Sequence, residues 1–493
     1  MSQSGILNLN IFKHPKTKLG VYGTLFLFVA AIVLFITTKL VIVFFLPLLA
    51  LPILYISNKL ILQAYLLFAS LAFSKDLQLG TLSLDLPDEF LMITSSGAII
   101  IFCIINKAAL LKHLKNDALF TMLILSFIYL ALNIFWSINP VLSIKYLLAK
   151  VWYFIPFAMG VFMFQQVQQK FIFNIIALLT YCSAFAVSIT LTYHIYLGLS
   201  FEKVNQACSL LFLNHVNYGS FIAIILPIAY YNYFYNSLYK KYKKINVMAL
   251  LVLSIGLVES YCRSAWLAVI IAAIAVWLFY NKLLFRAAIT SICLVTIFLL
   301  WLLSNNNYLR FKNNFSKTEF HTEFNQHWAA TFNGKDVSNA ERFYRWGAGM
   351  RMGAAYFPLG SGTNTFYPQY KKYSINAFKT WVSNNKEHST VHNFYLLLFI
   401  EQGAFGLAFF IALILVLLYQ FQYKGMLHIH KKMVAMLVGI IVIILMQLTS
   451  SDVLESDKVG PFFYFVFAVW WLLKNKFIAN NIIAAPIKNK NLI

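Results

Sequence analysis

The sequence is poor in charged residues and especially poor in acidic ones. Asp, Glu, Lys and Arg together make up 11% of its 493 residues, whereas soluble globular proteins carry roughly 25%. Sixteen acidic residues stand against 39 basic ones, which leaves a net charge of +23. Hydrophobic residues make up 61% of the chain, more than the core of a soluble domain buries. These proportions exclude a soluble globular protein and predict a chain that crosses a membrane many times.

Motifs of nucleotide, metal and redox chemistry are also missing. The sequence has no Walker loop, no dinucleotide fingerprint, and no HExxH or CxxC pattern. Sequence alone does not bring Cys208 and Cys262 within reach of each other, so no disulfide is predicted. The basic residues lie in short clusters between apolar runs, which is typical of topology signals rather than of nucleic-acid binding. We therefore expect no cofactor, no metal and no nucleic acid.

Fourteen apolar segments are candidate membrane spans. The expected fold is an all-α, polytopic transmembrane bundle of about 12–14 spans, with one long, partly helical loop on the outer side. The segments are about 20–38, 40–57, 60–74, 90–106, 118–136, 147–163, 171–197, 217–236, 245–261, 264–281, 284–303, 392–420, 431–449 and 460–473.

The charges of the loops predict that both termini are cytoplasmic. With the N-terminus inside, 21 of the 39 basic residues fall in inside segments and seven lie in or near short outside loops. The other eleven lie in one long outside segment, which does not count for this rule. The expected organisation is N-terminal transmembrane hairpins over 1–116, a core bundle over 117–303, a periplasmic loop over 304–391, C-terminal spans over 392–474 and a cytoplasmic basic tail over 475–493.

The 88-residue outer segment is polar and rich in aromatic residues, and structureless loops of this length are rare unless they are functional. Ser338 and Glu341 have the spacing of a capping box, so a helix is expected to begin there. On that helix Arg342 and Arg345 lie about 60° apart, and Arg351 faces the opposite side. Two arginines on one face suit bidentate contacts to phosphate. A solvated helix face is the alternative explanation.

A histidine opens the span after this segment. His392-Asn393 is followed, after nine further residues, by Gly403 and then Gly406. On a continuous helix Gly403 lies about 20° from His392, and Gly406 about 40° away on the other side. Small residues below a surface histidine let a neighbouring helix or a lipid chain approach closely. A packing face with an interfacial histidine above it explains the same stripe.

Ionisable residues also lie at the outer ends of other spans. Glu259 and Arg263 are spaced i, i+4, which suits a structural ion pair or an arginine that Glu259 holds until an anionic ligand binds. His215 lies at the outer start of a span, where histidines are more often interfacial than catalytic. His388 precedes His392 by four residues, and we assign it to the polar loop.

These motifs together resemble the O-antigen ligase and polymerase superfamily of bacterial glycosyltransferases. The family signature is His-[Asn/Ser/Gln]-x9-Gly-x-x-Gly followed by an apolar residue, and His392 to Leu407 matches it. Its loop carries a pattern like Glu-Arg-x3-Trp and then Pro-x-x-Gly-x-Gly. Glu341 to Trp346 and, with one residue fewer, Pro358 to Gly362 look like this pattern. The resemblance runs from about Asn139 to Leu417, is strongest over 250–410, and includes Ser137 to Pro140 and Arg263 to Leu267.

The resemblance implies a GT-C-like, metal-independent enzyme of the bacterial inner membrane with its active site on the periplasmic side. Its donor would be a glycan on undecaprenyl diphosphate. Its acceptor would be lipid A–core for an O-antigen ligase, another glycan for a polymerase, or a protein hydroxyl for an O-oligosaccharyltransferase. His392 would be the general base, and Arg263, Arg342 and Arg345 would bind the diphosphate. Supporting residues would be Glu259, His215, Trp346, Asn393, Gly403 and Gly406.

A lipid-linked oligosaccharide flippase is the main alternative from another class. A flippase needs charged residues along a cavity at mid-membrane depth. The notable charges of this sequence instead cluster at the outer ends of spans, beside the long outer segment. This distribution favours an enzyme.

Overall fold

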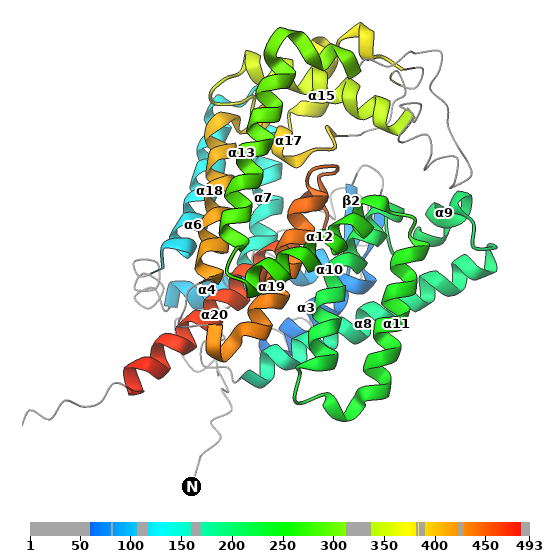
Figure 1. Cartoon of the computed structure of the whole chain (residues 1–493), viewed down its shortest axis with the longest axis vertical. Coiled ribbons are helices and arrows are strands. Elements are labelled where there is room, and N and C mark those ends of the chain that lie inside the picture. Colours follow the sequence, from blue (N-terminus) through cyan, green and yellow to red (C-terminus); the bar gives the residue numbers. More distant parts are fainter. Residues whose placement is uncertain are drawn as a thin grey trace, which may run out of the picture.

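Helices make up nearly all of the structure that is described, which confirms the predicted all-α bundle (Figure 1). The computed structural model describes residues 60–79, 82–105, 117–158, 169–311, 337–380, 383, 390–422 and 427–484. The predicted spans 20–38 and 40–57 lie outside these residues, so the total number of spans stays a prediction. Six described helices are long and apolar enough to cross a membrane: Ala118–Trp136, Lys170–Tyr196, Arg263–Tyr280, Leu284–Leu302, Gly403–Phe421 and His430–Gln447.

The helices follow the predicted order of spans. Before the long outer segment come α3 (Leu60–Phe73), α4 (Asp88–Ile105), α6 (Ala118–Asn133), α7 (Pro140–Phe157), α8 (Gln169–Tyr196), α9 (Val204–Cys208), α10 (His215–Phe234), α11 (Lys243–Glu259), α12 (Arg263–Tyr280) and α13 (Leu284–Leu303). From the described part of that segment onward come α15 (Val337–Ala355), α16 (Phe366–Gln369), α17 (Phe394–Glu401), α18 (Gly403–Phe421), α19 (Leu427–Gln447) and α20 (Gly460–Ala484). Short 3-10 turns are η3 (Ile134–Trp136), η5 (Phe201–Lys203), η6 (Lys240–Tyr242), η7 (Ser304–Phe311), η9 (Tyr370–Tyr373), η10 (Asn376–Phe378) and η11 (Val453–Glu455).

Helix α19 lies in the core of the bundle, whereas α13 lies at its edge. In the apolar window of α19, 72% of the residues are buried, against 6% in that of α13. Helix α12 packs on α19 and has a stripe of small buried residues, Ala265, Ala268, Ala272 and Ala275. Their spacing of three or four residues places them on one helix face, and small side chains let two helices approach closely within a membrane.

A β-hairpin connects α3 to α4. Strand β1 (Lys75–Leu79) pairs antiparallel with β2 (Leu82–Leu86), with Lys75 opposite Leu86. The sequence did not predict this hairpin, because two five-residue strands carry too little alternation to stand out between long apolar runs.

Helix α15 and the short helices after it lie across one end of the bundle (Figure 1). Two glycines let α15 pack closely on α17. A Cβ atom at Gly349 would lie 2.7 Å from the Ile400 side chain, and one at Gly353 would lie 2.5 Å from the Phe399 ring. The helix predicted near Ser338 begins at Val337, so the outer segment is partly helical as expected.

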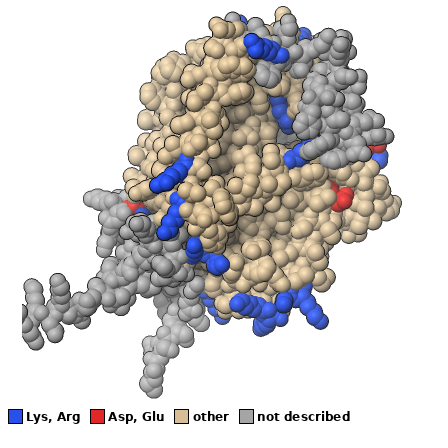
Figure 2. All heavy atoms as spheres, viewed as in Figure 1, with Lys and Arg blue, Asp and Glu red and all other residues tan. Residues whose placement is uncertain are grey.

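Basic residues mark the other end of the bundle. Lys and Arg side chains gather at the lower end of the face shown in Figure 2. The connection between α10 and α11 lies at this end in Figure 1 and carries the exposed residues Lys240, Lys241, Lys243 and Lys244. The connection between α10 and α11 and helix α15, for which the sequence predicts opposite sides of the membrane, therefore lie at opposite ends of the bundle.

The predicted span 392–420 is not one continuous helix. Helix α17 ends at Glu401 and α18 begins at Gly403, whose φ is +72°. His392 has a φ of +53° and precedes α17. The predicted helical phase between His392, Gly403 and Gly406 is therefore wrong, because the helix periodicity does not continue across a break.

Candidate active site

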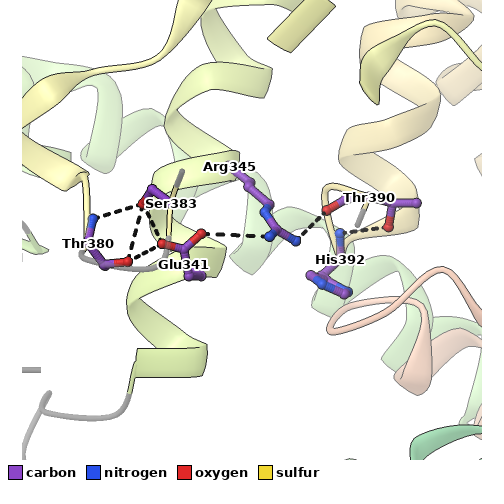
Figure 3. A network of polar contacts seen from close by, with 6 residues as sticks. All are labelled: Glu341, Arg345, Thr380, Ser383, Thr390 and His392. Atoms are coloured by element: carbon purple, nitrogen blue, oxygen red, sulfur yellow. Dashed lines mark hydrogen bonds and ion pairs between the residues drawn. The ribbon is translucent and has the colours of Figure 1, made fainter. Parts of the chain in front are cut away.

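His392 is fixed by the helix of the outer segment (Figure 3). Two neighbouring side chains of α15 donate hydrogen bonds to the backbone just before it: Arg345 Nη1 to the Thr390 carbonyl at 3.3 Å and Trp346 Nε1 to the Val391 carbonyl at 3.0 Å. The backbone N–H of His392 donates to Thr390 Oγ1 at 3.4 Å. The ring is thus held beside α15, and its side chain is 37% exposed.

Asn393 links this histidine to the connection between α19 and α20. Its side-chain oxygen caps α17 by accepting from the Leu396 N–H at 3.0 Å. Its amide nitrogen donates to the Thr449 carbonyl at 3.1 Å. The Phe394 N–H donates to the Leu448 carbonyl at 2.9 Å. These bonds bring the end of α19 next to the His392 ring.

Asp452 is the carboxylate that this arrangement places beside the histidine. Its Oδ1 lies 4.0 Å from His392 Nδ1, and its side chain is 8% exposed. The sequence interpretation missed it, since 60 positions separate the two residues. A signal was present, because Asp452, Glu455 and Asp457 put three acidic residues into one short connection of a chain with only sixteen.

The site holds the imidazole neutral and the carboxylate ionised near pH 7. Burial, followed by repulsion from the charges of Arg342 and Arg345, lowers the pKa of His392 to about 4. Burial is also the main cause that raises the pKa of Asp452 to about 6, and the charge of Glu455 adds to it. An ionised carboxylate 4.0 Å from Nδ1 favours the tautomer that carries its proton on Nδ1, which leaves the Nε2 lone pair of His392 available as a base.

The three arginines of α15 differ in burial and in partners. Arg345 is buried, and its Nη2 lies 3.7 Å from Glu341 Oε2. Arg342 is half-buried and donates from Nη1 to Asn339 Oδ1 at 3.2 Å. Arg351 is exposed. The predicted separation of Arg351 from the other two is consistent with this pattern.

Glu341 does not act as the distal residue of a capping box. It accepts hydrogen bonds from the hydroxyls of Thr380 and Ser383 (Figure 3). With its ion pair to Arg345, it joins α15 to the chain that leads to His392. The predicted capping box was wrong, because the helix already begins at Val337 and Ser338 is therefore not its N-cap.

The turn between α11 and α12 forms the second basic edge of the site. Glu259 ends α11 and Arg263 opens α12, with Tyr261 at a φ of +51° between them. The i, i+4 argument for an ion pair therefore does not apply, since the two residues are on different helices. Burial raises the pKa of the adjacent Cys262 thiol, and the charge of Arg342 opposes this rise. Arg342 thus lies close enough to act on both this turn and His392.

His215 opens α10 at the same end of the bundle. Its Nδ1 lies 2.8 Å from Asn205 Oδ1, and its ring is 6.3 Å from that of Phe201. The Phe201 ring in turn lies 5.6 Å from that of Tyr261, in the turn before Arg263. These contacts link His215 to the turn that precedes Arg263.

The space beside the two glycines predicted to admit a helix or a lipid chain is occupied by other residues of the protein. A Cβ atom at Gly403 would lie 2.0 Å from the Pro358 carbonyl oxygen, and one at Gly406 would lie 2.3 Å from the Gln402 side chain. The turn at Pro358 is held by Glu401, whose two carboxylate oxygens accept from the Asn364 and Phe366 N–H groups at 2.8 and 3.0 Å. Gly403 packs the turn against the break between α17 and α18, whereas Gly406 lies against Gln402 and against Tyr129 of α6.

The same turn contacts the segment that opens α7. The Ile138 N–H donates to the Ser361 carbonyl at 3.0 Å, and the Ser143 hydroxyl to the Thr363 carbonyl at 2.9 Å. Three of the segments on which the resemblance rests are therefore packed together. His388 lies outside the described residues.

Residues 248–411 match the family model described as O-Antigen ligase. This range contains Arg263, Arg342 and His392. No curated protein matches the chain. The match confirms the resemblance to the O-antigen ligase and polymerase superfamily and supports a multi-pass membrane glycosyltransferase of that type.

Proposed function

We propose that the protein transfers a glycan from undecaprenyl diphosphate to an acceptor hydroxyl, in the manner of an O-antigen ligase, with His392 as the general base. One observation carries the proposal: the His392 ring lies 4.0 Å from the buried carboxylate of Asp452 and near the charges of Arg342 and Arg345. A base and cations side by side are what attack on a phosphate-linked sugar requires.

The proposed reaction is a single displacement. Nε2 of His392 takes the proton of the acceptor hydroxyl, to which it must lie within about 3 Å. The acceptor oxygen then forms a bond to the anomeric carbon as the bond between that carbon and the diphosphate oxygen breaks. Undecaprenyl diphosphate leaves with the electron pair. Asp452 would orient the ring and stabilise the imidazolium that forms.

Arg342 and Arg263 are the proposed ligands of the diphosphate. Arg342 is half-buried beside His392, and Arg263 opens α12, where the helix N-terminus adds partial positive charge. Arg345 is buried against Glu341, so we assign it mainly to positioning the segment before His392. Trp346 has the same role, because its indole N–H bonds to Val391.

We also propose the placement that the sequence predicts. The outer segment 304–391 would face the periplasm and both termini the cytoplasm of a bacterium with an inner membrane. The hairpins over 1–116, the core bundle over 117–303, the spans over 392–474 and the tail over 475–493 keep their predicted assignments. Basic clusters at the end opposite α15 support this placement.

The test is a strain that lacks the gene and carries wild-type or His392→Ala protein, analysed by gels of lipopolysaccharide and glycoproteins. We expect His392→Ala to insert normally and to lose at least about 100-fold in transfer. Lost O-chains with polymer left on the carrier indicate a ligase, and a single capped repeat indicates a polymerase. Intact lipopolysaccharide with missing glycoproteins indicates protein glycosylation. Full activity of His392→Ala removes the base assignment.

A further inference from the structure

The connection between α19 and α20, residues 448–459, is held from α7 by an ion pair between a buried lysine and a half-buried glutamate. Lys150 is 5% exposed, and its Nζ lies 2.9 Å from Glu455 Oε2. The same ammonium donates to the Leu454 carbonyl at 3.0 Å, and the Tyr146 hydroxyl donates to Glu455 Oε1 at 2.9 Å. These three contacts of Lys150 and Tyr146 therefore all fall on residues 454–455.

Asp452 lies three residues away, on the side that faces His392. The charged and titratable groups that act on its carboxylate are Glu455 in the same connection, Arg345 of α15 and His392, and the Thr390 hydroxyl bonds to it. Helix α7 contacts Glu455 through Lys150 and Tyr146. Whatever changes the charge or position of Glu455 therefore reaches Asp452 directly.

A charged pair is a costly way to anchor a loop. Removing charges from water opposes the formation of such a pair, and apolar residues of similar volume often stabilise a fold as well or better. A charged pair at this place is explained if the charges of Lys150 and Glu455 act on Asp452. Glu455 alone would favour a protonated Asp452 by repulsion, and the Lys150 ammonium beside it offsets that repulsion.

We propose that Lys150 and Glu455 are positioning residues, whose ion pair holds Asp452 against His392 and offsets the repulsion between the carboxylates of Glu455 and Asp452. This inference rests on the proposed function, because it concerns the base of that reaction. Neither residue is assigned a contact with substrate.

The test measures the reactivity of His392 rather than glycan transfer. Diethyl pyrocarbonate acylates neutral imidazole, and mass spectrometry of the His392 peptide gives the rate at each pH between 4 and 8. In the wild-type protein we expect the rate to fall as Asp452 is protonated. Lys150→Met should move the midpoint of that fall upward by about one pH unit, and Glu455→Gln should move it downward by a similar amount. The double variant should return close to the wild-type midpoint.

Opposite shifts separate this proposal from simple anchoring, which predicts that both single variants change His392 in the same way. Lys458→Met is the matched control, because Lys458 anchors the same connection by donating to the Ser74 carbonyl at 2.7 Å, and it should leave the midpoint in place. If one single variant fails to fold, the midpoints of the other single variant and of the neutral double variant test the proposal. Shifts in one direction, or none, overturn the proposal. Expected shifts in a protein without transfer activity contradict the proposed function alone.

Discussion

At the scale of single residues, the proposed chemistry depends on two groups whose protonation is displaced in opposite senses. His392 has a pKa lowered to about 4 and Asp452 one raised to about 6. Between these values both groups are neutral, and above about 6 only the carboxylate is charged. The acid limit of activity should therefore be set by Asp452 rather than by the histidine itself.

Transfer by the purified enzyme should fall as pH drops through about 6, since a protonated Asp452 no longer favours the tautomer with the proton on Nδ1 and no longer stabilises an imidazolium. Asp452→Asn should lower the transfer rate by about 100-fold or more and should abolish the decrease in rate near pH 6. Initial rates between pH 4 and 8 provide the measurement. If the decrease in rate near pH 6 is unchanged in Asp452→Asn, that decrease belongs to another titrating group.

We also expect EDTA to leave the transfer rate unchanged. Inhibition by EDTA that added divalent metal reverses would contradict the metal-free mechanism.

Arg342 and Arg351 both lie on α15, so Arg351 provides the control for substitutions of Arg342. We expect Arg342→Ala and Arg263→Ala each to lower transfer by about 100- to 1000-fold, because each removes a charge-assisted contact to the leaving diphosphate. Arg351→Ala should stay within a few-fold of wild type, since Arg351 is exposed. Transfer rates at equal amounts of inserted protein test this. Equal losses in Arg342→Ala and Arg351→Ala would rule out a diphosphate role specific to Arg342.

At the scale of elements, the break between α17 and α18 sets where the outer segment meets the bundle. Gly403 has a φ of +72°, and the backbone of Pro358 to Gly360 lies against it. A residue with a side chain is strained at this φ and also displaces backbone atoms that have nowhere to move. The turn and the break therefore stabilise each other.

Gly403→Ala should destabilise the folded protein by about 1–3 kcal/mol and lower transfer through displacement of the turn. Gly97→Ala in α4 is the control, because a Cβ atom there meets nothing within 4 Å and alanine is the better helix former. Thermal unfolding of both variants in detergent tests the difference. A Gly403→Ala protein as stable as Gly97→Ala would mean that the turn does not pack on this break.

At the scale of the whole molecule, exposed lysines distinguish the end of the bundle that lies opposite α15. The connection between α10 and α11 has exposed lysines at the end opposite α15, and Asp117 at the start of α6 pairs with Lys474 of α20 at 2.9 Å. The rule that basic loops stay on the cytoplasmic side predicts that this lysine-rich end faces the cytoplasm.

Reporter fusions at Lys241 and Ser338 should therefore report opposite sides, with Lys241 in the cytoplasm and Ser338 in the periplasm. An alkaline phosphatase fusion is active only outside the cytoplasm, and a green fluorescent protein fusion shows the reverse. A fusion at Lys424 serves as the cytoplasmic control. Phosphatase activity at Lys241 would invert the topology and place the His392 end inside the cell.

The sequence by itself determined the helical membrane fold, the polarity of the loops, and His392, Arg263 and Arg342 as candidate residues. These features are local: spans follow from apolar length, sidedness from nearby lysines, and the motifs from short spacings. The tertiary structure alone decided that Asp452 lies 4.0 Å from His392, that Arg345 is buried against Glu341, and that α17 and α18 are separate. Each of these depends on contacts between distant segments, which set burial and backbone strain, and no local pattern encodes which segments will meet.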